Sequence, residues 1–129
     1  MTKGDWLDLT VLERRKYNLL VETMDLSQQL GEAMDRGDDV SVRLLVAMRQ
    51  EPILGLEEVK KAIENRLGSL PTEERERVLA LAGGAAPEGE GETTYVNQVG
   101  SARRLLERVL EFDRRLNRRL AGENSFYGK

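Results

Sequence analysis

The first third of the chain carries apolar side chains at a helical spacing that is sustained for about seven turns. These residues are Leu9, Leu12, Leu19, Leu20, Met24, Leu26, Leu30 and Met34. Their spacing is typical of one broad face of an amphipathic helix. A helix over about residues 6–36 would be roughly 40–45 Å long at 1.5 Å per residue, which is too long for a compact globule. The stripe therefore predicts one arm of a helical hairpin.

The start of this first helix is open to two interpretations. Thr10 and Glu13 have the spacing of a capping box, whereas Asp5 would cap an earlier start. At the other end, Gly37 follows the last apolar residue and suits the left-handed conformation of a helix C-terminus.

A second helix is predicted over about residues 40–68, and Asp38, Asp39 and Ser41 are each suited to cap it. Its apolar stripe is Leu45, Met48, Pro52, Leu56, Val59, Ile63, Leu67 and Leu70. Pro52 lacks a backbone donor and its ring clashes with the preceding turn, so a kink or break is expected near Gln50–Glu51. Because the turn between the two helices is short, they should run antiparallel.

Two further helices are expected. A short third helix spans about residues 71–82, with Pro71 in its first turn. Residues 83–94 are rich in Gly and Glu and have no apolar anchor, which predicts a flexible acidic linker. The last helix spans about residues 95–121, and Gly122 is its predicted stop.

The chain of 129 residues is therefore predicted to be a single all-α domain, residues 1–129, with a bundle-like hairpin of long helices. Charged residues make up 33% of it and aromatic residues only 5%, which is typical of long helices and coiled coils. We expect no membrane insertion, because no apolar run approaches 18 residues. The lack of cysteine fits a cytoplasmic protein.

Several classes of chemistry are disfavoured by composition. The chain has no histidine and no cysteine, so it lacks the commonest general base, metal ligand and thiol nucleophile. Glycines in 83–94 are not followed by the Lys-Ser/Thr of a phosphate-binding loop. We therefore expect no enzymatic activity, no catalytic residues, no cofactor and no metal site.

The last helix combines an apolar seam with a basic surface. The seam residues follow one another at steps of four, three, four and four: Leu105, Val109, Phe112, Leu116 and Leu120. Seven arginines lie largely off the seam: Arg103, Arg104, Arg108, Arg114, Arg115, Arg118 and Arg119. A solvated or intramolecular role, protein contact and nucleic-acid contact all remain open for them, although no stacking aromatics accompany them as in nucleic-acid modules.

The order of these parts suggests a family. After the long helix come a Gly-Asp turn at 37–38, the interrupted second helix and Leu-Pro-Thr-Glu-Glu-Arg at 70–75. The final helix carries Leu-Asn-Arg-Arg-Leu at 116–120, and Phe-Tyr-Gly follows at 126–128. In this order the chain resembles the FlgN-type flagellar export chaperones, in which a helical hairpin shelters hook–filament junction proteins before type III export.

The resemblance implies a cytoplasmic chaperone that binds the amphipathic terminal helices of hook–filament junction proteins and keeps them unpolymerised. The expected partner-binding residues combine the seam with three residues chosen mainly on the resemblance: Leu105, Val109, Phe112, Leu116, Asn117, Leu120, Phe126 and Tyr127. A core role for the seam is the alternative, and a helix that alternates between its own bundle and its cargo would serve both.

Two other functions remain in view. The first is a coiled-coil structural or adaptor subunit, which would form a stable oligomer. The second is a nucleic-acid-associated protein that uses the arginine-rich helix and binds with steep salt dependence. The sequence leaves open whether the chain forms a homodimer.

Overall fold

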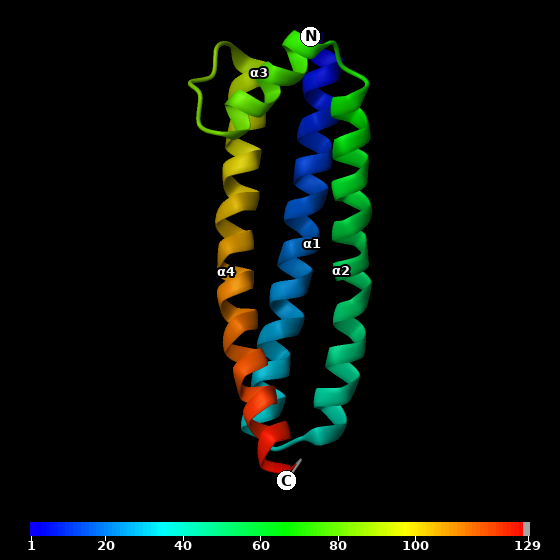
Figure 1. Ribbon diagram of the computed structural model, residues 1–129, viewed down its shortest axis with the longest axis vertical. Helices are drawn as coiled ribbons and strands as arrows, with labels where there is room; N and C mark the ends of the chain where they lie inside the picture. The colour runs from blue at the N-terminus through cyan, green and yellow to red at the C-terminus, as the bar shows by residue number, and fades with distance from the viewer. Residues whose placement is uncertain (128–129) are drawn as a thin grey trace.

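The computed structural model describes residues 1–127, with side chains described as far as Gly122, and it confirms the all-α, bundle-like fold. Four helices follow one another in the described chain: α1 Lys3–Asp35, α2 Asp39–Gly68, α3 Thr72–Ala82 and α4 Glu90–Tyr127. At 1.5 Å per residue, α1 is roughly 50 Å long. The chain begins at one end of the elongated molecule and reaches the other end with α4 (Figure 1).

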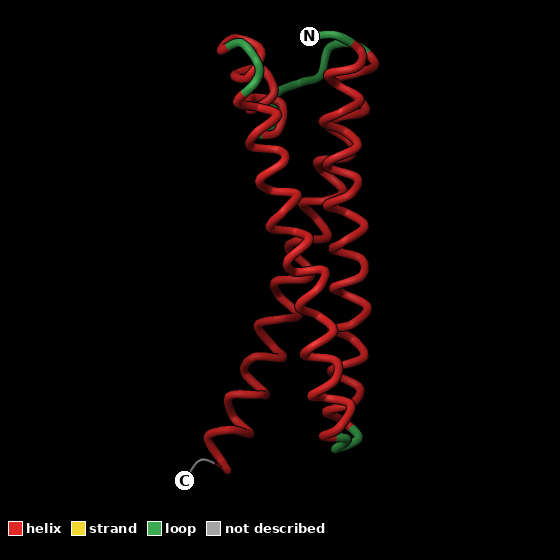
Figure 2. The backbone as a smooth tube through the Cα atoms, turned by 90° about the vertical axis from the view of Figure 1, so that its right-hand side faces the viewer, coloured by secondary structure: helices red, strands yellow, loops and turns green. Residues whose placement is uncertain are grey.

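The helix α1 is the centre of the packing. It packs along its length against α2 and against α4, while α3 packs against the first part of α4. Figure 1 shows α2 and α4 on either side of α1, and α3 at the end where the chain begins. In Figure 2 α4 overlaps the α1–α2 hairpin near the middle of the molecule, and its C-terminal end lies apart from the turn between α1 and α2. Three helices therefore run the length of the molecule, and the short α3 covers only one end.

The start of α1 differs from both predicted starts. Thr2 caps the helix: its hydroxyl accepts a hydrogen bond from the Asp5 backbone N–H at 3.1 Å, and Asp5 accepts one from the Thr2 N–H. This capping box places the cap three residues before Asp5, the earlier of the two predicted caps. Thr10 and Glu13, the alternative predicted capping pair, lie in the interior of α1 and their side chains are buried in the bundle.

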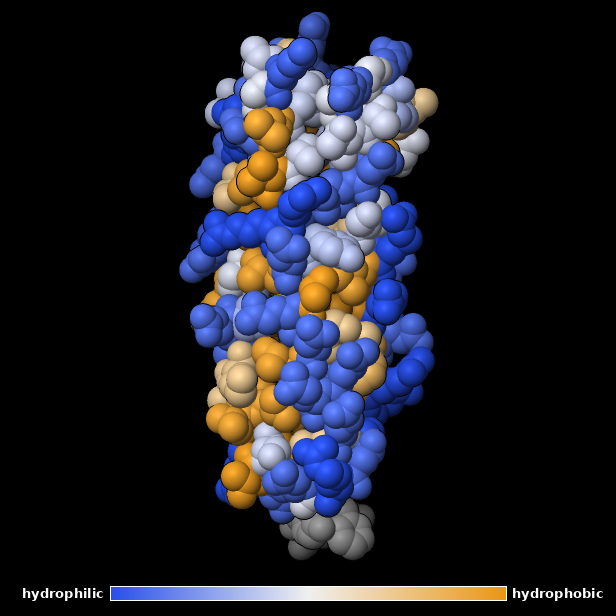
Figure 3. All heavy atoms as spheres, turned by 180° about the vertical axis from the view of Figure 1, so that it is seen from behind, coloured by the Kyte–Doolittle hydropathy of each residue, from blue (hydrophilic) through white to orange (hydrophobic). Residues whose placement is uncertain are grey.

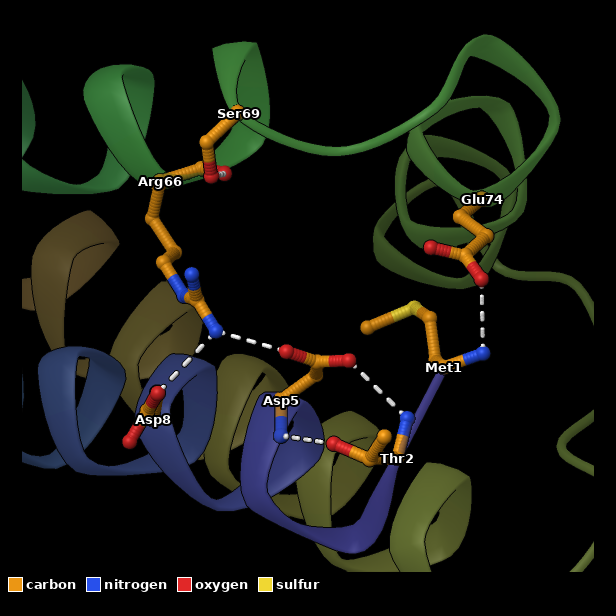
Figure 4. A network of polar contacts seen from close by, with 7 residues as sticks. All are labelled: Met1, Thr2, Asp5, Asp8, Arg66, Ser69 and Glu74. Carbon is orange, nitrogen blue, oxygen red and sulfur yellow. Dashed lines mark hydrogen bonds and ion pairs between the residues drawn. The ribbon is translucent and has the colours of Figure 1, made fainter.

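A polar network fastens the start of α1 to α2 (Figure 4). Arg66 near the end of α2 pairs with Asp5 at 2.6 Å and with Asp8 at 3.0 Å. The pKa of Asp5 lies below its usual range, mainly because it accepts the Thr2 backbone hydrogen bond. One carboxylate thus caps its own helix and pairs with the neighbouring helix. At the same end, the Met1 amino group donates to Glu74 of α3 at 2.7 Å.

The turn between α1 and α2 confirms the sequence prediction. Gly37 has a φ of 67°, the left-handed conformation that favours glycine. Asp38 caps α2 by accepting hydrogen bonds from the Ser41 backbone N–H and hydroxyl at 3.1 and 2.6 Å.

The break expected near Gln50–Glu51 is wrong. The helix α2 runs uninterrupted from Asp39 to Gly68 with Pro52 inside it, and the proline ring is fully buried. Burial of that ring offsets the hydrogen bond that proline cannot make. Gly55 supports this packing, because a Cβ there would lie 3.0 Å from Leu19 of α1.

The linker and the last helix also need correction. The helix α4 begins at Glu90, so only residues 83–89 of the predicted 83–94 linker are non-helical. Glu92 accepts from the Glu88 N–H at 2.9 Å and pairs with Arg77 of α3 at 2.5 Å. Acidic residues of the predicted flexible linker therefore make local and inter-helix contacts. Gly122 does not stop α4, which continues to Tyr127.

The core consists of three apolar clusters stacked along α1. Beside α3 lie Leu9, Leu70, Val78, Leu81, Tyr95 and Val99. The middle cluster is Leu20, Leu105 and Val109. The cluster near the α1–α2 turn is Leu26, Leu30, Ala33, Met34, Leu45 and Leu116. Among the described helices, none combines the length and apolar character required to cross a membrane.

Candidate partner-binding surface

The structure places most of the predicted seam of α4 in the core. Three seam residues are buried against α1 and α2: Leu105, Val109 and Leu116. Two are half-buried at the edge of the same clusters: Phe112 and Leu120. A partner would reach the buried three only if α4 moved away from α1.

The remaining predicted residues do not join this seam. Asn117 is exposed on α4. The side chains of Phe126 and Tyr127 lie outside the described residues. The eight predicted residues therefore do not form one continuous accessible surface in the part of the chain that the structure describes.

A polar contact holds α4 in place between the middle apolar cluster and the apolar cluster near the α1–α2 turn. Asp113 of α4 pairs with Arg49 of α2 at 2.7 Å and accepts a hydrogen bond from the Ser27 hydroxyl of α1 at 3.2 Å. Ser27 is fully buried. One carboxylate therefore joins all three long helices, and lifting α4 would break both contacts.

An accessible apolar groove lies elsewhere on the bundle, between α1, α2 and α4. It measures about 600 Å³ and is bordered by the apolar side chains Leu20, Ile53, Leu56, Ile63 and Leu106. Leu20 forms its floor, fully buried, while the other four are half-buried. Because α3 covers only one end of the bundle, this groove lies where a fourth long helix would pack in a four-helix bundle.

Charged residues border the groove. Lys16 lies on α1, and Glu57, Lys60 and Glu64 lie on α2. The fifth charged lining residue, Glu13 of α1, differs from these because it is buried. The arrangement suits an amphipathic partner, with apolar contact in the middle and charge at the edges.

Glu13 is not among the residues predicted for the site, although its position in the sequence carries a signal. Glu13 comes four residues after Leu9 and seven before Leu20, so it shares their helical face. A carboxylate on an apolar face is unusual and needs a partner or a function. The interpretation of Glu13 as a cap residue concealed that signal.

Apolar residues are also exposed outside the groove. Viewed from behind, they form separate patches between charged residues rather than one continuous surface (Figure 3). On the first half of α2, Val40, Leu44 and Met48 are exposed at a spacing of four residues. These three side chains form a short apolar stripe that lies outside the groove lining.

Several arginines of α4 are engaged within the chain. Arg103 donates to the Ala82 carbonyl at the end of α3. Arg119 pairs with Asp35 of α1 at 2.7 Å, and Arg115 pairs with Glu111 at 2.7 Å. These contacts give the arginine-rich helix an intramolecular role.

A second hollow, of about 440 Å³, lies between the start of α1 and the start of α4. Its lining includes Trp6, Leu7, Glu88, Glu90 and Glu92. It is more polar than the groove, and Glu92 already pairs with Arg77 there. In the described residues, no group of three or more carboxylates is arranged to hold a metal ion.

Comparison of the chain with protein-family models, with curated proteins and with solved structures produced no match.

Proposed function

We propose that this protein binds an amphipathic helix of another protein and acts as a chaperone of the export type. The observation that supports this most is the open side of the bundle, where α1, α2 and α4 border an apolar groove of about 600 Å³. A groove of this kind recognises a helix through apolar side chains at a spacing of three or four residues.

The cargo that we propose is the terminal helices of flagellar hook–filament junction proteins, bound in the cytoplasm. This finer proposal rests on the resemblance of residues 70–75, 116–120 and 126–128 to the FlgN-type chaperones. An amphipathic helix that later polymerises would be sheltered by covering its apolar face, which prevents premature self-association.

The groove is a better site for this purpose than the seam of α4. Leu105, Val109 and Leu116 are committed to the core, and exposing them would break the contacts of Asp113 with Arg49 and Ser27. The groove needs no such rearrangement. Phe112, Asn117 and Leu120 remain candidates for a secondary contact.

The test is calorimetric titration with synthetic terminal helices of junction proteins at low and high salt. We expect binding that changes little with salt, because apolar contact dominates in the groove. Ile53→Asp should abolish it, whereas Leu54→Asp should not, because Leu54 is exposed and does not line the groove. Absence of heat with every junction segment would contradict the cargo, and loss of binding in both variants would contradict the site.

A coiled-coil adaptor or structural subunit is the second candidate. The exposed stripe Val40, Leu44 and Met48 favours it, because apolar residues at this spacing bury well against another helix. This function predicts a stable homo-oligomer. Sedimentation equilibrium distinguishes the two, since the chaperone proposal does not require self-association and Leu44→Asp would dissociate an oligomer held by this stripe.

A further inference from the structure

Glu13 of α1 is a buried carboxylate, and the described residues leave one of its oxygen atoms without a hydrogen bond. It is 7% exposed, and its Oε2 atom has no hydrogen-bond partner among the described residues. Burial raises the pKa of this carboxyl group, while Lys16 and Arg103 oppose the rise only from a distance. An unsatisfied buried acceptor is costly to a fold, and a buried charge more so.

The groups that face Glu13 do not satisfy it. Lys16 lies one turn further along α1 and is half-buried. Arg103 of α4 donates to the Ala82 carbonyl. Tyr95 of α4 is buried nearby, and its own pKa is raised to about 12 by burial and by the Glu13 charge. No ion pair within 4 Å joins Glu13 to a cation in the described part of the chain, so its Oε2 atom is free to accept a hydrogen bond from an incoming donor.

Glu13 is one of the residues that line the apolar groove, so a donor seated in the groove lies beside this side chain. Along α2 the groove lining runs from Ile53 to Glu64, roughly 17 Å or three turns of helix. The lining carries the carboxylates of Glu13, Glu57 and Glu64 and the ammonium groups of Lys16 and Lys60. The lining thus holds more carboxylates than ammonium groups, and one of the carboxylates is buried. This charge distribution favours an occupant that carries a cation.

We propose that the groove receives a three-turn amphipathic helix of another polypeptide, whose Lys or Arg side chain donates hydrogen bonds to Glu13. This inference rests on the proposed function and adds a rule for partner choice. The apolar stripe of the partner helix packs on Leu20, Leu56 and Leu106. Pairing of its basic residue with Glu13 fixes the position of the partner helix along the groove. Bonds between a cation and a carboxylate are about twice as strong as neutral ones, and burial strengthens them further.

The rule is testable without knowing the natural partner. The probe is a phage-displayed library of helical peptides, about four turns long, with Leu fixed at positions i, i+4 and i+7. One position beside this stripe varies among Lys, Arg, Gln and Glu, and its place is scanned along the helix. The library is selected on the full chain, on Glu13→Gln and on Glu58→Gln. Glu58 is an exposed residue of α2 outside the groove lining, so it controls for the general loss of a negative charge.

We expect Lys and Arg peptides to be enriched about tenfold over Gln peptides on the wild-type chain and on Glu58→Gln, but less than about twofold on Glu13→Gln. The Gln variant keeps the shape of the side chain, and its unfolding midpoint verifies that it folds. Equal enrichment on Glu13→Gln would overturn the inference, because the preference would then be general charge attraction.

Two further outcomes separate this inference from the proposed function. Peptides that are selected without preference for a basic residue would overturn the role of Glu13 but leave helix binding intact. Sedimentation would show a dimer if a second copy of this chain occupied the groove, and Ile53→Asp would restore the monomer. That result would overturn the proposal that the occupant is a different polypeptide. The proposed function itself is tested separately, by the calorimetric titration with junction-protein helices.

Discussion

Arg49 of α2 and Asp113 of α4 form an ion pair of 2.7 Å with the Arg49 side chain only 11% exposed. Since Ser27 of α1 also donates to Asp113, this carboxylate connects the three long helices at one level of the bundle. The pair bridges α2 and α4, which otherwise pack chiefly on α1. It therefore controls how firmly α4 is held against the hairpin.

Replacing Asp113 with Asn should lower the free energy of unfolding by about 1–3 kcal/mol, because a largely buried guanidinium loses its counter-charge. Urea denaturation monitored by circular dichroism measures the loss. The matched control is Glu111→Gln on the same helix, which breaks the exposed pair with Arg115 and should cost less than about 0.5 kcal/mol. Equal losses in the two variants would show that the Arg49 pair contributes no more than a surface contact.

The buried position of Leu116 predicts a large packing effect. Leu116 is 2% exposed, whereas Leu110 on the same helix is 51% exposed. Leu116→Ala should cost about 2–4 kcal/mol, because a cavity remains in the cluster with Leu30 and Leu45. Leu110→Ala should cost less than about 0.5 kcal/mol. If both variants unfold at the same urea concentration as wild type, the seam of α4 is not part of the core.

Two glycines provide a matched test of backbone conformation. Gly37 has a φ of 67°, and Gly68 lies in the last turn of α2; neither has a neighbour that a Cβ would meet within 4 Å. Gly37→Ala should lower the free energy of unfolding by about 1 kcal/mol, because alanine disfavours the left-handed conformation. Gly68→Ala should be neutral or stabilise by up to about 1 kcal/mol. Thermal unfolding would contradict this account if both substitutions shifted the midpoint in the same direction.

Glu13→Gln should stabilise the isolated chain at neutral pH. The pKa of Glu13 is raised in the folded state, so the neutral carboxyl favours folding below its unfolded pKa. That contribution is lost as the pH rises through the raised pKa, where the charged form must be buried. The gain from Gln should therefore be present at pH 7 and disappear below about pH 4.

Denaturation of the two chains across this pH range checks the prediction, with Glu58→Gln as the exposed control. A Gln variant that is less stable than wild type at pH 7 would show that Glu13 has a stabilising partner. A buried residue that lowers the stability of the isolated chain is expected at a binding site rather than in a structural core.

Much of the helical architecture could be predicted from spacing alone. The stripe from Leu9 to Met34 required a long α1, and Gly37 with Asp38 fixed the turn. These features are local, so the sequence carries them directly. The errors arose where tertiary contact overrode a local signal. Burial keeps Pro52 inside an unbroken helix, and the contact of Glu92 with Arg77 supports helical structure in the acidic segment.

The site was harder to predict than the fold, because periodicity does not say which apolar face is left uncovered. The seam from Leu105 to Leu120 reads equally well as core or as binding surface, and its inner residues are core. The groove depends on how α2 and α4 pack against α1, and on α3 being too short to close it. Only Glu13, a carboxylate on an apolar face, marked the groove in the sequence.

The central claim is that a partner helix occupies the groove while α4 stays on the hairpin. The most direct measurement is the two-dimensional ¹H–¹⁵N spectrum of the full chain during titration with the terminal helix of a junction protein. The account predicts chemical-shift changes for the backbone amides of Leu20, Leu56 and Leu106, with little change for those of Ser27 and Asp113. Shifts confined to Phe112–Leu120, or no shift with any junction helix, would contradict it.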